Sequence, residues 1–210
     1  MKICYVIGAG ELPLIYIKKQ DSLVIAADGG LKKLGDICPD IIVGDFDSLG
    51  FVPDGQNVIT LPIKKDVTDM HYAVELGIEK GYETFVLYGG TGGRPDHTFA
   101  NYALLYSLSE RGLKGYLIGD GYVVTAMRNS SIKLPNHQDG TVSVFSANEC
   151  AKGVTIKGLE YTLNNAELYF SNPLGVSNSF TGQECEISVS DGTLLVMWEE
   201  NNVEEFIDKL

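Results

Sequence analysis

Short apolar runs alternate with amphipathic stretches over the first 120 residues of the chain, and each run has the length of a buried strand. The pattern predicts strands at residues 2–7, 23–26, 41–43, 58–61, 84–88 and 115–118. One helix is expected over 70–80 and another over about 98–111, the latter ending at Gly112 with an apolar face made of Phe99, Tyr102, Ala103, Leu105, Tyr106 and Leu108. Because strands and helices alternate, we expect a parallel, doubly wound, Rossmann-like α/β sheet.

The pattern changes at Gly121, after which β-type runs follow one another without a long helical period. Strands are predicted at residues 122–127, 131–134, 141–146, 153–156, 167–170, 185–189 and 193–198. Turn pairs such as Asp139-Gly140 and Asp191-Gly192 separate several of them. We therefore expect an α/β domain at residues 1–120 and an all-β sandwich domain at 121–210, with residues 201–210 as a closing helix or strand edge.

Charge and cysteine content narrow the range of functions. A net charge of −12 over 210 residues argues against nonspecific binding to nucleic acid, which relies on basic surface. The same acidity would suit a cationic small substrate, although it serves solubility equally well. The four cysteines form no CxxC pair and are typical of reduced thiols in a cytoplasmic protein. We find no apolar stretch long enough for a membrane span, and Met1 to Tyr5 begins a strand rather than a signal peptide.

A loop with four glycines, from Gly89 to Gly93, lies between a predicted strand and the helix that follows, and Arg94 comes directly after it. Glycines let the backbone approach an anion, the first N–H groups of a helix lack intrahelical partners, and an arginine adds a fork of donors. The loop therefore predicts a phosphate site. The alternative is a turn with a helix cap, which one or two glycines would suffice to make.

Acidic residues follow other predicted strands. Asp45 and Asp47 come directly after residues 41–43, and side chains two residues apart on an extended backbone point the same way. Two neighbouring carboxylates favour a cation between them, and hard oxygen ligands suit Mg²⁺. The alternative is a solvated turn. Asp28 repeats the arrangement after another strand, whereas Asp66 and Asp69 could equally be the N-cap and N3 residues of the 70–80 helix.

All of these turns follow predicted strands, so in an open α/β sheet they would gather at one carboxyl edge, where ligands bind. Gly8-Ala9-Gly10 after the first strand is a weak match to a dinucleotide fingerprint, because Pro13 stands where the third glycine belongs.

The motifs together resemble the thiamine pyrophosphokinase family. The resemblance rests on the ADGG segment at Asp28, GDFDS at Asp45, KDVTD at Asp69 and GGRPDH at Arg94, in the order of that family. It continues in the β region, where residues 158–163 are similar to a GL-x-Y-x-L element and residues 174–178 end in a serine–asparagine pair. Thr162 and Ser179 depart from the family pattern, which expects proline and glutamate there.

The resemblance implies pyrophosphoryl transfer from ATP to the hydroxyethyl oxygen of thiamine, giving thiamine diphosphate and AMP. It implies roles for three sets of residues: Asp28, Asp45, Asp47, Asp66 and Asp69 in catalysis, with Asp45, Asp47 and Asp69 holding Mg²⁺; Gly90, Gly92, Gly93, Arg94, Asp96, His97 and Asn101 in ATP binding; and Thr68, Ser177 and Asn178 in substrate binding. The family also implies a homodimer, with thiamine between the α/β domain of one subunit and the β domain of its partner. Trp198 or Phe180 could stack on thiamine, but core packing is the preferred interpretation for Trp198.

Two other kinds of function use the same features. A Mg²⁺-dependent nucleotide pyrophosphohydrolase would need the same aspartates and phosphate loop with water as the acceptor. A non-catalytic nucleotide- or thiamine-binding module would need the loop, but a cluster of aspartates would be costly without a catalytic purpose.

Overall fold

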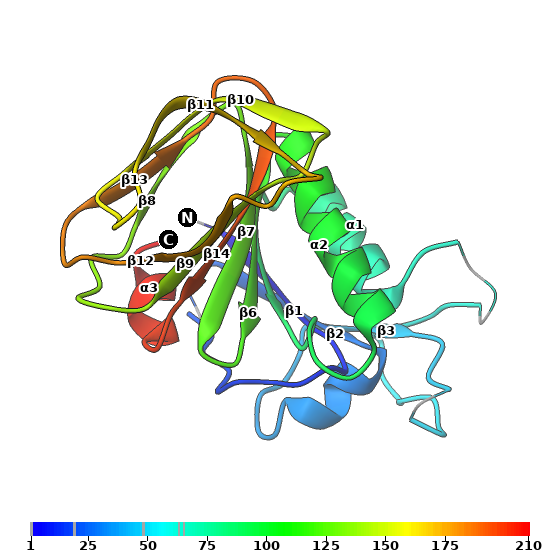
Figure 1. Ribbon diagram of the computed structural model, residues 1–210. Coiled ribbons are helices and arrows are strands. Elements are labelled where there is room, and N and C mark those ends of the chain that lie inside the picture. Colours follow the sequence, from blue (N-terminus) through cyan, green and yellow to red (C-terminus); the bar gives the residue numbers. More distant parts are fainter. Residues whose placement is uncertain (1, 19, 48, 63, 65) are drawn as a thin grey trace. The chain divides into compact units, whose positions relative to one another are not determined.

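The computed structural model describes residues 2–18, 20–47, 49–62, 64 and 66–210, and its chain divides into two compact units (Figure 1). The first unit contains Met1–Leu104, Gly115–Asp120 and Val203–Leu210, and the second contains Leu105–Lys114 and Gly121–Asn202. Residues 105–114 thus belong to the second unit and residues 203–210 to the first, the reverse of the two expected domains. The domain bounds at 1–120 and 121–210 stay a prediction. A side-chain contact helps to explain why residues 105–114 group with the second unit: the Asn148 amide nitrogen donates to the hydroxyl of Tyr106 at 3.1 Å.

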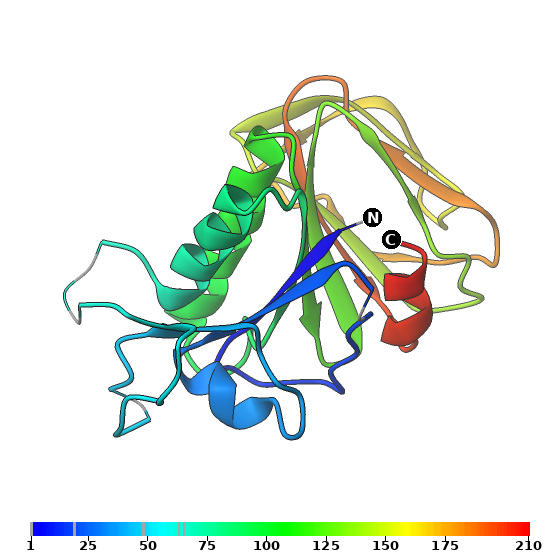
Figure 2. The ribbon, with the colours of Figure 1, turned by 180° about the vertical axis from the view of Figure 1, so that it is seen from behind.

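The strands of the first unit pair mainly in parallel, as the alternating pattern predicts. In sheet order they are β6 (Lys114–Gly119), β5 (Thr84–Tyr88), β1 (Ile3–Ile7), β2 (Ser22–Ala27), β3 (Ile41–Gly44) and β4 (Val58–Thr60). The pairs β5–β1, β1–β2, β2–β3 and β3–β4 are parallel, and β1 and β2 can be followed in blue in Figure 2. Strands β1 and β5 are buried along their whole length, which is typical of the centre of a parallel sheet.

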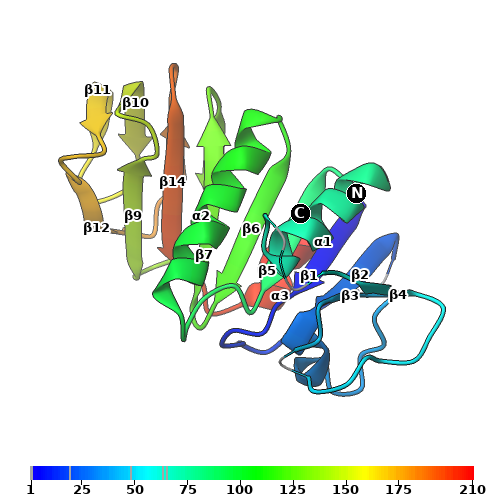
Figure 3. The same ribbon diagram turned by 90° about the vertical axis from the view of Figure 1, so that its right-hand side faces the viewer.

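The connections depart from a doubly wound fold. Helix α1 (Asp69–Glu79) packs on β1, β2 and β3, as Figure 3 shows, but β2 leads into a short 3-10 helix, η1 (Asp28–Lys33), in place of an α-helix. The described part of the β1–β2 connection, residues 8–18, 20 and 21, contains no helix. The mixed α/β class is therefore confirmed, whereas the finer Rossmann-like description is not.

Two buried tyrosines hold the helix-free β1–β2 connection in place. The hydroxyl of Tyr88 accepts from the Tyr16 backbone nitrogen at 3.2 Å and donates to the Tyr16 carbonyl at 2.9 Å. The hydroxyl of Tyr5 accepts from the backbone nitrogen of Lys18 at 3.1 Å. At the other end of the chain, α3 (Val203–Asp208) supplies Asp208, whose carboxylate accepts from the Tyr16 hydroxyl at 3.1 Å. The bonds of Tyr5 and Tyr88 satisfy the hydroxyls of two buried side chains, and together with the exposed Tyr16–Asp208 bond they hold the segment that follows Gly8.

The second unit is built from antiparallel strands. One run has the order β12 (Gly175–Ser179), β9 (Thr141–Ser146), β14 (Thr193–Glu199), β7 (Tyr122–Arg128), and the other has the order β11 (Leu163–Tyr169), β10 (Cys150–Lys157), β13 (Cys185–Ser188), β8 (Ser131–Leu134). Every strand predicted in this part of the chain is present. The expectation of β structure is confirmed, while its finer description as a sandwich stays a prediction.

Strand β12 and the start of helix α2 also differ from the sequence-based expectation. Strand β12 was not predicted, because Gly175 to Ser179 lacks regular alternation: the register shifts between Gly175 and Asn178, and Ser177 has a φ of +59°. Helix α2 (Pro95–Glu110) begins at Pro95 and not near residue 98, since proline is well suited to the first helical position.

The apolar face expected for α2 is partly wrong. Phe99 is 68% exposed and Ala103 is also exposed, whereas Leu104, Leu105 and Leu108 are buried. Within the described part of the chain, no helix is both long and apolar enough to cross a membrane.

Candidate active site

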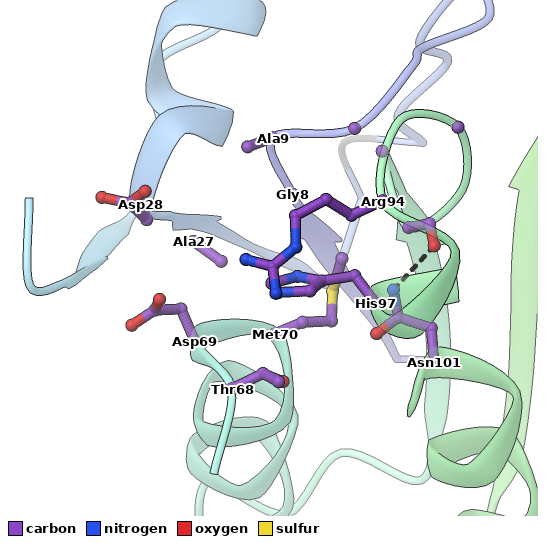
Figure 4. Close-up of a pocket in the computed structure, with 14 residues that line it drawn as sticks. Gly8, Ala9, Ala27, Asp28, Thr68, Asp69, Met70, Arg94, His97 and Asn101 are labelled. Atoms are coloured by element: carbon purple, nitrogen blue, oxygen red, sulfur yellow. Dashed lines mark hydrogen bonds between the residues drawn. The ribbon is translucent and has the colours of Figure 1, made fainter. Parts of the chain in front are cut away.

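Three carboxylates converge in the first unit. Asp28 follows β2, Asp45 follows β3 and Asp69 begins α1, and one oxygen of each lies within 4.8 Å of one oxygen of the others. All three side chains are half-buried. Figure 4 shows Asp28 and Asp69 on the same side of a pocket. Like charges at this spacing repel one another, so the arrangement favours a bound cation.

The strand register brings Asp28 and Asp45 together. Ala27 of β2 pairs with Val43 of β3, so Asp28 and Gly44 are the next residues along the two strands. Asp28 then turns with a φ of +47°, and buried Phe46 turns with a φ of +59°. These left-handed residues end both strands sharply, which keeps the carboxylates at the sheet edge.

The structure groups the acidic residues differently from the sequence-based assignment of Asp45, Asp47 and Asp69. Asp28 takes the third place in the cluster, while Asp47 is exposed and donates its backbone N–H to Asp45 Oδ1 at 3.4 Å. Metal binding by Asp47 stays a prediction. The difference arises because the two-residue alternation does not continue through Phe46, whose φ is positive.

The start of α1 differs from the interpretation of Asp66 and Asp69 as its capping residues. The N-cap is Thr68, whose hydroxyl oxygen accepts from the backbone nitrogen of His71 at 3.2 Å, and Asp69 is the first helical residue. The interpretation of Asp66 as N-cap and Asp69 as N3 is therefore wrong. Asp66 is exposed and precedes the cap.

The glycine loop lies against the chain that continues β1. Backbone bonds run from Gly8 N to Tyr88 O at 2.8 Å, from Gly10 N to Gly89 O at 2.9 Å and from Glu11 N to Thr91 O at 2.9 Å. The Gly8-Ala9-Gly10 segment thus forms a wall beside the loop. Gly89, Gly92 and Gly93 all have positive φ, as the predicted tight loop requires.

Asn101 fixes this loop from helix α2. Its side-chain nitrogen donates to the carbonyl of Gly90 at 2.7 Å, drawn as the dashed line in Figure 4, and the residue is only 6% exposed. Asn101 was expected to orient the loop or to contact ATP; its bond to Gly90 agrees with the first role, and contact with ATP stays a prediction.

Arg94 is charged and held by a neighbour. Two hydrogen bonds join its guanidinium to the carboxylate of Asp96. The bond to Asp96 raises the pKa of Arg94, and the bond to Arg94 lowers the pKa of Asp96. The pair is therefore ionised at neutral pH. Asp96 Oδ1 also accepts from the backbone nitrogen of His97 at 3.0 Å.

The pocket in Figure 4 has a volume of about 250 Å³. Its wall is made of Gly8, Ala9, Gly10, Ala27, Asp28, Thr68, Asp69, Met70, Gly89, Gly90, Gly92, Arg94, His97 and Asn101. Of the predicted site residues of this unit, Asp45, Asp47, Asp66, Gly93 and Asp96 do not line it. Sequence reasoning missed Met70, an apolar helix residue that gives no signal of its own, and treated Gly8 to Gly10 only as a weak fingerprint.

The predicted substrate residues of the second unit, Ser177 and Asn178, differ in exposure. Asn178 is 5% exposed; its Oδ1 accepts from the backbone nitrogens of Tyr161 and Ser179, both at 2.9 Å, and its Nδ2 donates to the Tyr161 carbonyl at 2.6 Å. Asn178 therefore ties β12 to the segment before β11. Ser177 is exposed, and the roles of both residues toward a substrate stay predictions.

The two aromatic residues considered for stacking are both buried. Trp198 is 1% exposed, in agreement with the core packing that the sequence favours. Phe180 is 4% exposed and packs edge-on against His137, with ring centroids 5.0 Å apart.

Parallel strands whose carboxyl ends carry a carboxylate cluster beside a glycine loop and an arginine define an α/β protein that handles phosphate groups. Two family descriptions match the chain: "Thiamin pyrophosphokinase, catalytic domain" at residues 15–117 and "Thiamin pyrophosphokinase, vitamin B1 binding domain" at residues 129–194. The chain belongs to the thiamine pyrophosphokinase family, a family of transferases, as its motifs predicted.

Relatives of the chain carry the same family name. It is 26% identical over 187 residues to the thiamine pyrophosphokinase of Bacillus subtilis, covering 85% of this chain and 87% of that protein. It is 26% identical over 174 residues to thiamin pyrophosphokinase 1 of Caenorhabditis elegans, covering 78% and 71%. The crystal structure of the Bacillus subtilis enzyme matches with a TM-score of 0.84 at 25% identity, over 95% of this chain and 100% of that one. That of Geobacillus thermodenitrificans matches with a TM-score of 0.82 at 25% identity, over 95% and 98%.

Proposed function

We propose that the protein transfers a pyrophosphoryl group from ATP to the hydroxyethyl oxygen of thiamine, giving thiamine diphosphate and AMP. Membership of the family supports this reaction over the alternatives. The observation that carries it is the convergence of Asp28, Asp45 and Asp69 beside the pocket walled by the glycine loop. A pyrophosphoryl transfer needs a cation site next to a phosphate pocket, because the triphosphate is strongly anionic and must be neutralised and positioned.

The donor set of the cluster fits Mg²⁺. Carboxylate oxygens are its preferred protein ligands, and oxygens bound to one Mg²⁺ at about 2.1 Å lie about 3 Å apart when adjacent and about 4.2 Å apart when opposite. Oxygens within 4.8 Å of one another need to close by no more than about 1.8 Å to share an ion. Asp28, Asp45 and Asp69 would hold the ion, with Asp47 as a further ligand at the exposed end of the turn. When bound, the ion would neutralise phosphate charge.

The remaining groups of the site have separate tasks. Arg94 and the amides of the glycine loop bind the nucleotide phosphates, with Gly90 held by Asn101. The thiamine oxygen forms a bond to the β-phosphorus while the bond from that phosphorus to the α–β bridging oxygen breaks, so AMP leaves with that oxygen. The hydroxyl proton passes to one of the cluster's aspartates. Thr68 would contact substrate, a role supported by its position at the pocket wall, where it caps α1.

We propose that the working form is a cytoplasmic homodimer, with thiamine held by the second unit of one subunit around Ser177. Exposed apolar side chains of the second unit support a partner surface, because such side chains gain from being covered: Tyr161, Phe170, Leu174 and Val176. The four cysteines are all free, which suits a reducing compartment. Light scattering on the purified protein tests the dimer, and Leu174→Glu should shift the mass toward that of a monomer.

The function is tested by incubating purified protein with ATP, Mg²⁺ and thiamine and separating the products by chromatography. We expect equal amounts of thiamine diphosphate and AMP, and neither product without thiamine or after chelation of the metal. AMP and pyrophosphate formed without thiamine would identify a hydrolase. Binding of both ligands without turnover would identify a non-catalytic module.

A further inference from the structure

Gly44 lies directly against Asp28 in the first unit. Along the parallel pairing of β2 and β3, Asp28 and Gly44 follow the paired residues Ala27 and Val43. A Cβ atom on Gly44 would lie 2.9 Å from Cα, 3.0 Å from Cβ and 3.2 Å from the backbone nitrogen of Asp28. These are main-chain atoms and the root of the side chain, so rotation of the Asp28 side chain cannot relieve the contact.

We propose that Gly44 is a positioning residue for the reaction: its missing side chain lets Asp28 come close enough to Asp45 and Asp69 for all three carboxylates to share one cation. The inference rests on the proposed function in that it takes the cluster to bind a divalent cation. It adds a residue that touches neither substrate nor ion and acts through Asp28.

The backbone around this contact has little freedom to adjust. On one side, the Gly44 carbonyl accepts from the backbone nitrogen of Leu61 at 2.9 Å, and Gly44 pairs with Thr60 of β4. On the other side, Asp28 already has a left-handed φ of +47°. The chain just after it is also tightly packed, because a Cβ on Gly30 would lie 1.9 Å from the carbonyl oxygen of Ile7. A methyl group at position 44 must therefore push Asp28 out of place or break strand pairing.

A small displacement matters because the ligands of one Mg²⁺ have narrow spacings: adjacent oxygens lie about 3 Å apart and opposite ones about 4.2 Å. The three carboxylate oxygens lie within 4.8 Å of one another, which lets them meet at one ion. Moving Asp28 by several tenths of an ångström to admit a methyl group takes its carboxylate away from that shared position. Supporting residues of metal sites typically change metal affinity by about ten- to a hundredfold when mutated.

The test is Gly44→Ala, with Mn²⁺ as the probe ion and its binding to the nucleotide-free protein followed by electron paramagnetic resonance. We expect Mn²⁺ affinity to fall by about tenfold or more, while circular dichroism shows a folded protein. Gly35→Ala is the control, because Gly35 has a φ of +56° and nothing lies within 4 Å of an added Cβ. It should lower the melting temperature through backbone strain and leave Mn²⁺ affinity unchanged.

A double variant separates positioning from general damage. Asp28→Gly removes one cation ligand and gives the backbone more freedom, so adding Gly44→Ala to it should cause no further loss of Mn²⁺ affinity. If Gly44→Ala alone fails to fold, the double variant should be the more stable of the two, and equal instability would overturn the inference. A folded Gly44→Ala protein with wild-type Mn²⁺ affinity would also overturn it. Wild-type protein that forms thiamine diphosphate but binds no Mn²⁺ would overturn the inference alone, whereas absence of both would overturn the proposed function with it.

Discussion

The guanidinium of Arg94 is bound by the carboxylate of Asp96 through two hydrogen bonds, from Nε to Oδ1 at 3.2 Å and from Nη2 to Oδ2 at 2.6 Å. The side chains are 70% and 62% exposed. Exposed ion pairs of this kind contribute little to stability. If Arg94 binds phosphate as proposed, the phosphate group should therefore be able to replace Asp96 at small cost.

Arg94→Ala should weaken ATP binding by about ten- to a hundredfold, since a charge-assisted contact to a phosphate is lost. Thiamine affinity, measured separately by calorimetry, should stay unchanged. Arg128→Ala is the matched control, because Arg128 also pairs with a carboxylate, that of Glu110, but belongs to the second unit. Normal ATP affinity in Arg94→Ala would show that Arg94 only caps the loop.

Asp45→Asn should abolish formation of thiamine diphosphate without lowering the melting temperature, because the half-buried carboxylate belongs to the cluster and not to the core. Asp47→Asn makes the comparison informative, since Asp47 is exposed and lies outside the cluster. We expect it to retain more Mn²⁺ affinity than Asp45→Asn. Equal losses of Mn²⁺ affinity in the two variants would support the sequence-based assignment of Asp47 as a metal ligand alongside Asp45.

The strands were predictable because burial follows the apolar runs closely. Residues 84–88 are all buried, and the predicted and observed bounds of β5 agree. Strand β12 could not be predicted, since its bulge and the positive φ of Ser177 break the alternation on which such predictions depend. The start of α2 was missed for a different reason: the helical period becomes visible only after Pro95, although proline itself marks a helix start.

The convergence of acidic residues was predictable, but their grouping was not. Aspartates and glycines after strands indicate that these turns meet at one edge, and Asp28, Asp45 and Asp69 do converge, while binding of a cation and of phosphate stays a prediction. That Asp28 takes the third place depends on the β2–β3 register and on the space left by Gly44, which are properties of the folded chain. The bonds from Asn178 to Tyr161 likewise join residues 17 positions apart, and no local pattern reveals them.

Stability should fall as pH rises above about 9. Burial, with a contribution from Asp40, raises the pKa of the Cys4 thiol from 9.0 to about 12, and burial raises that of Cys185 to about 11. The folded protein thus holds these protons more tightly than the unfolded chain, so the stabilisation is complete below about pH 9 and is lost as pH rises toward 11–12.

Urea unfolding between about pH 8 and about pH 10.5 measures this loss. Cys4→Ala should flatten the pH dependence, although the smaller side chain lowers stability at every pH. A free energy of unfolding that stays constant across this range would contradict the assignment of Cys4 and Cys185 as buried, neutral thiols.

Asn178 and Ser177 are neighbours in β12, but Asn178 is buried and Ser177 is exposed. Substitution of Asn178 should therefore affect stability more than substitution of Ser177. Asn178→Ala leaves the backbone nitrogens of Tyr161 and Ser179 and the carbonyl of Tyr161 without their side-chain partner. Unsatisfied buried groups typically cost about 1–3 kcal/mol, and we expect a loss of that size in the free energy of unfolding. Ser177→Ala changes an exposed side chain and should alter stability by no more than about 0.5 kcal/mol.

Urea unfolding and thiamine binding measured on both variants distinguish support of the fold from contact with substrate. If Asn178 acts by holding Tyr161 in place, Asn178→Ala loses stability and thiamine affinity together. If Ser177 contacts thiamine, Ser177→Ala loses affinity alone, because its exposed hydroxyl adds nothing to the core. An Asn178→Ala protein with unchanged stability but weakened thiamine binding would mean that the amide meets the substrate directly and that its bonds to Tyr161 are dispensable.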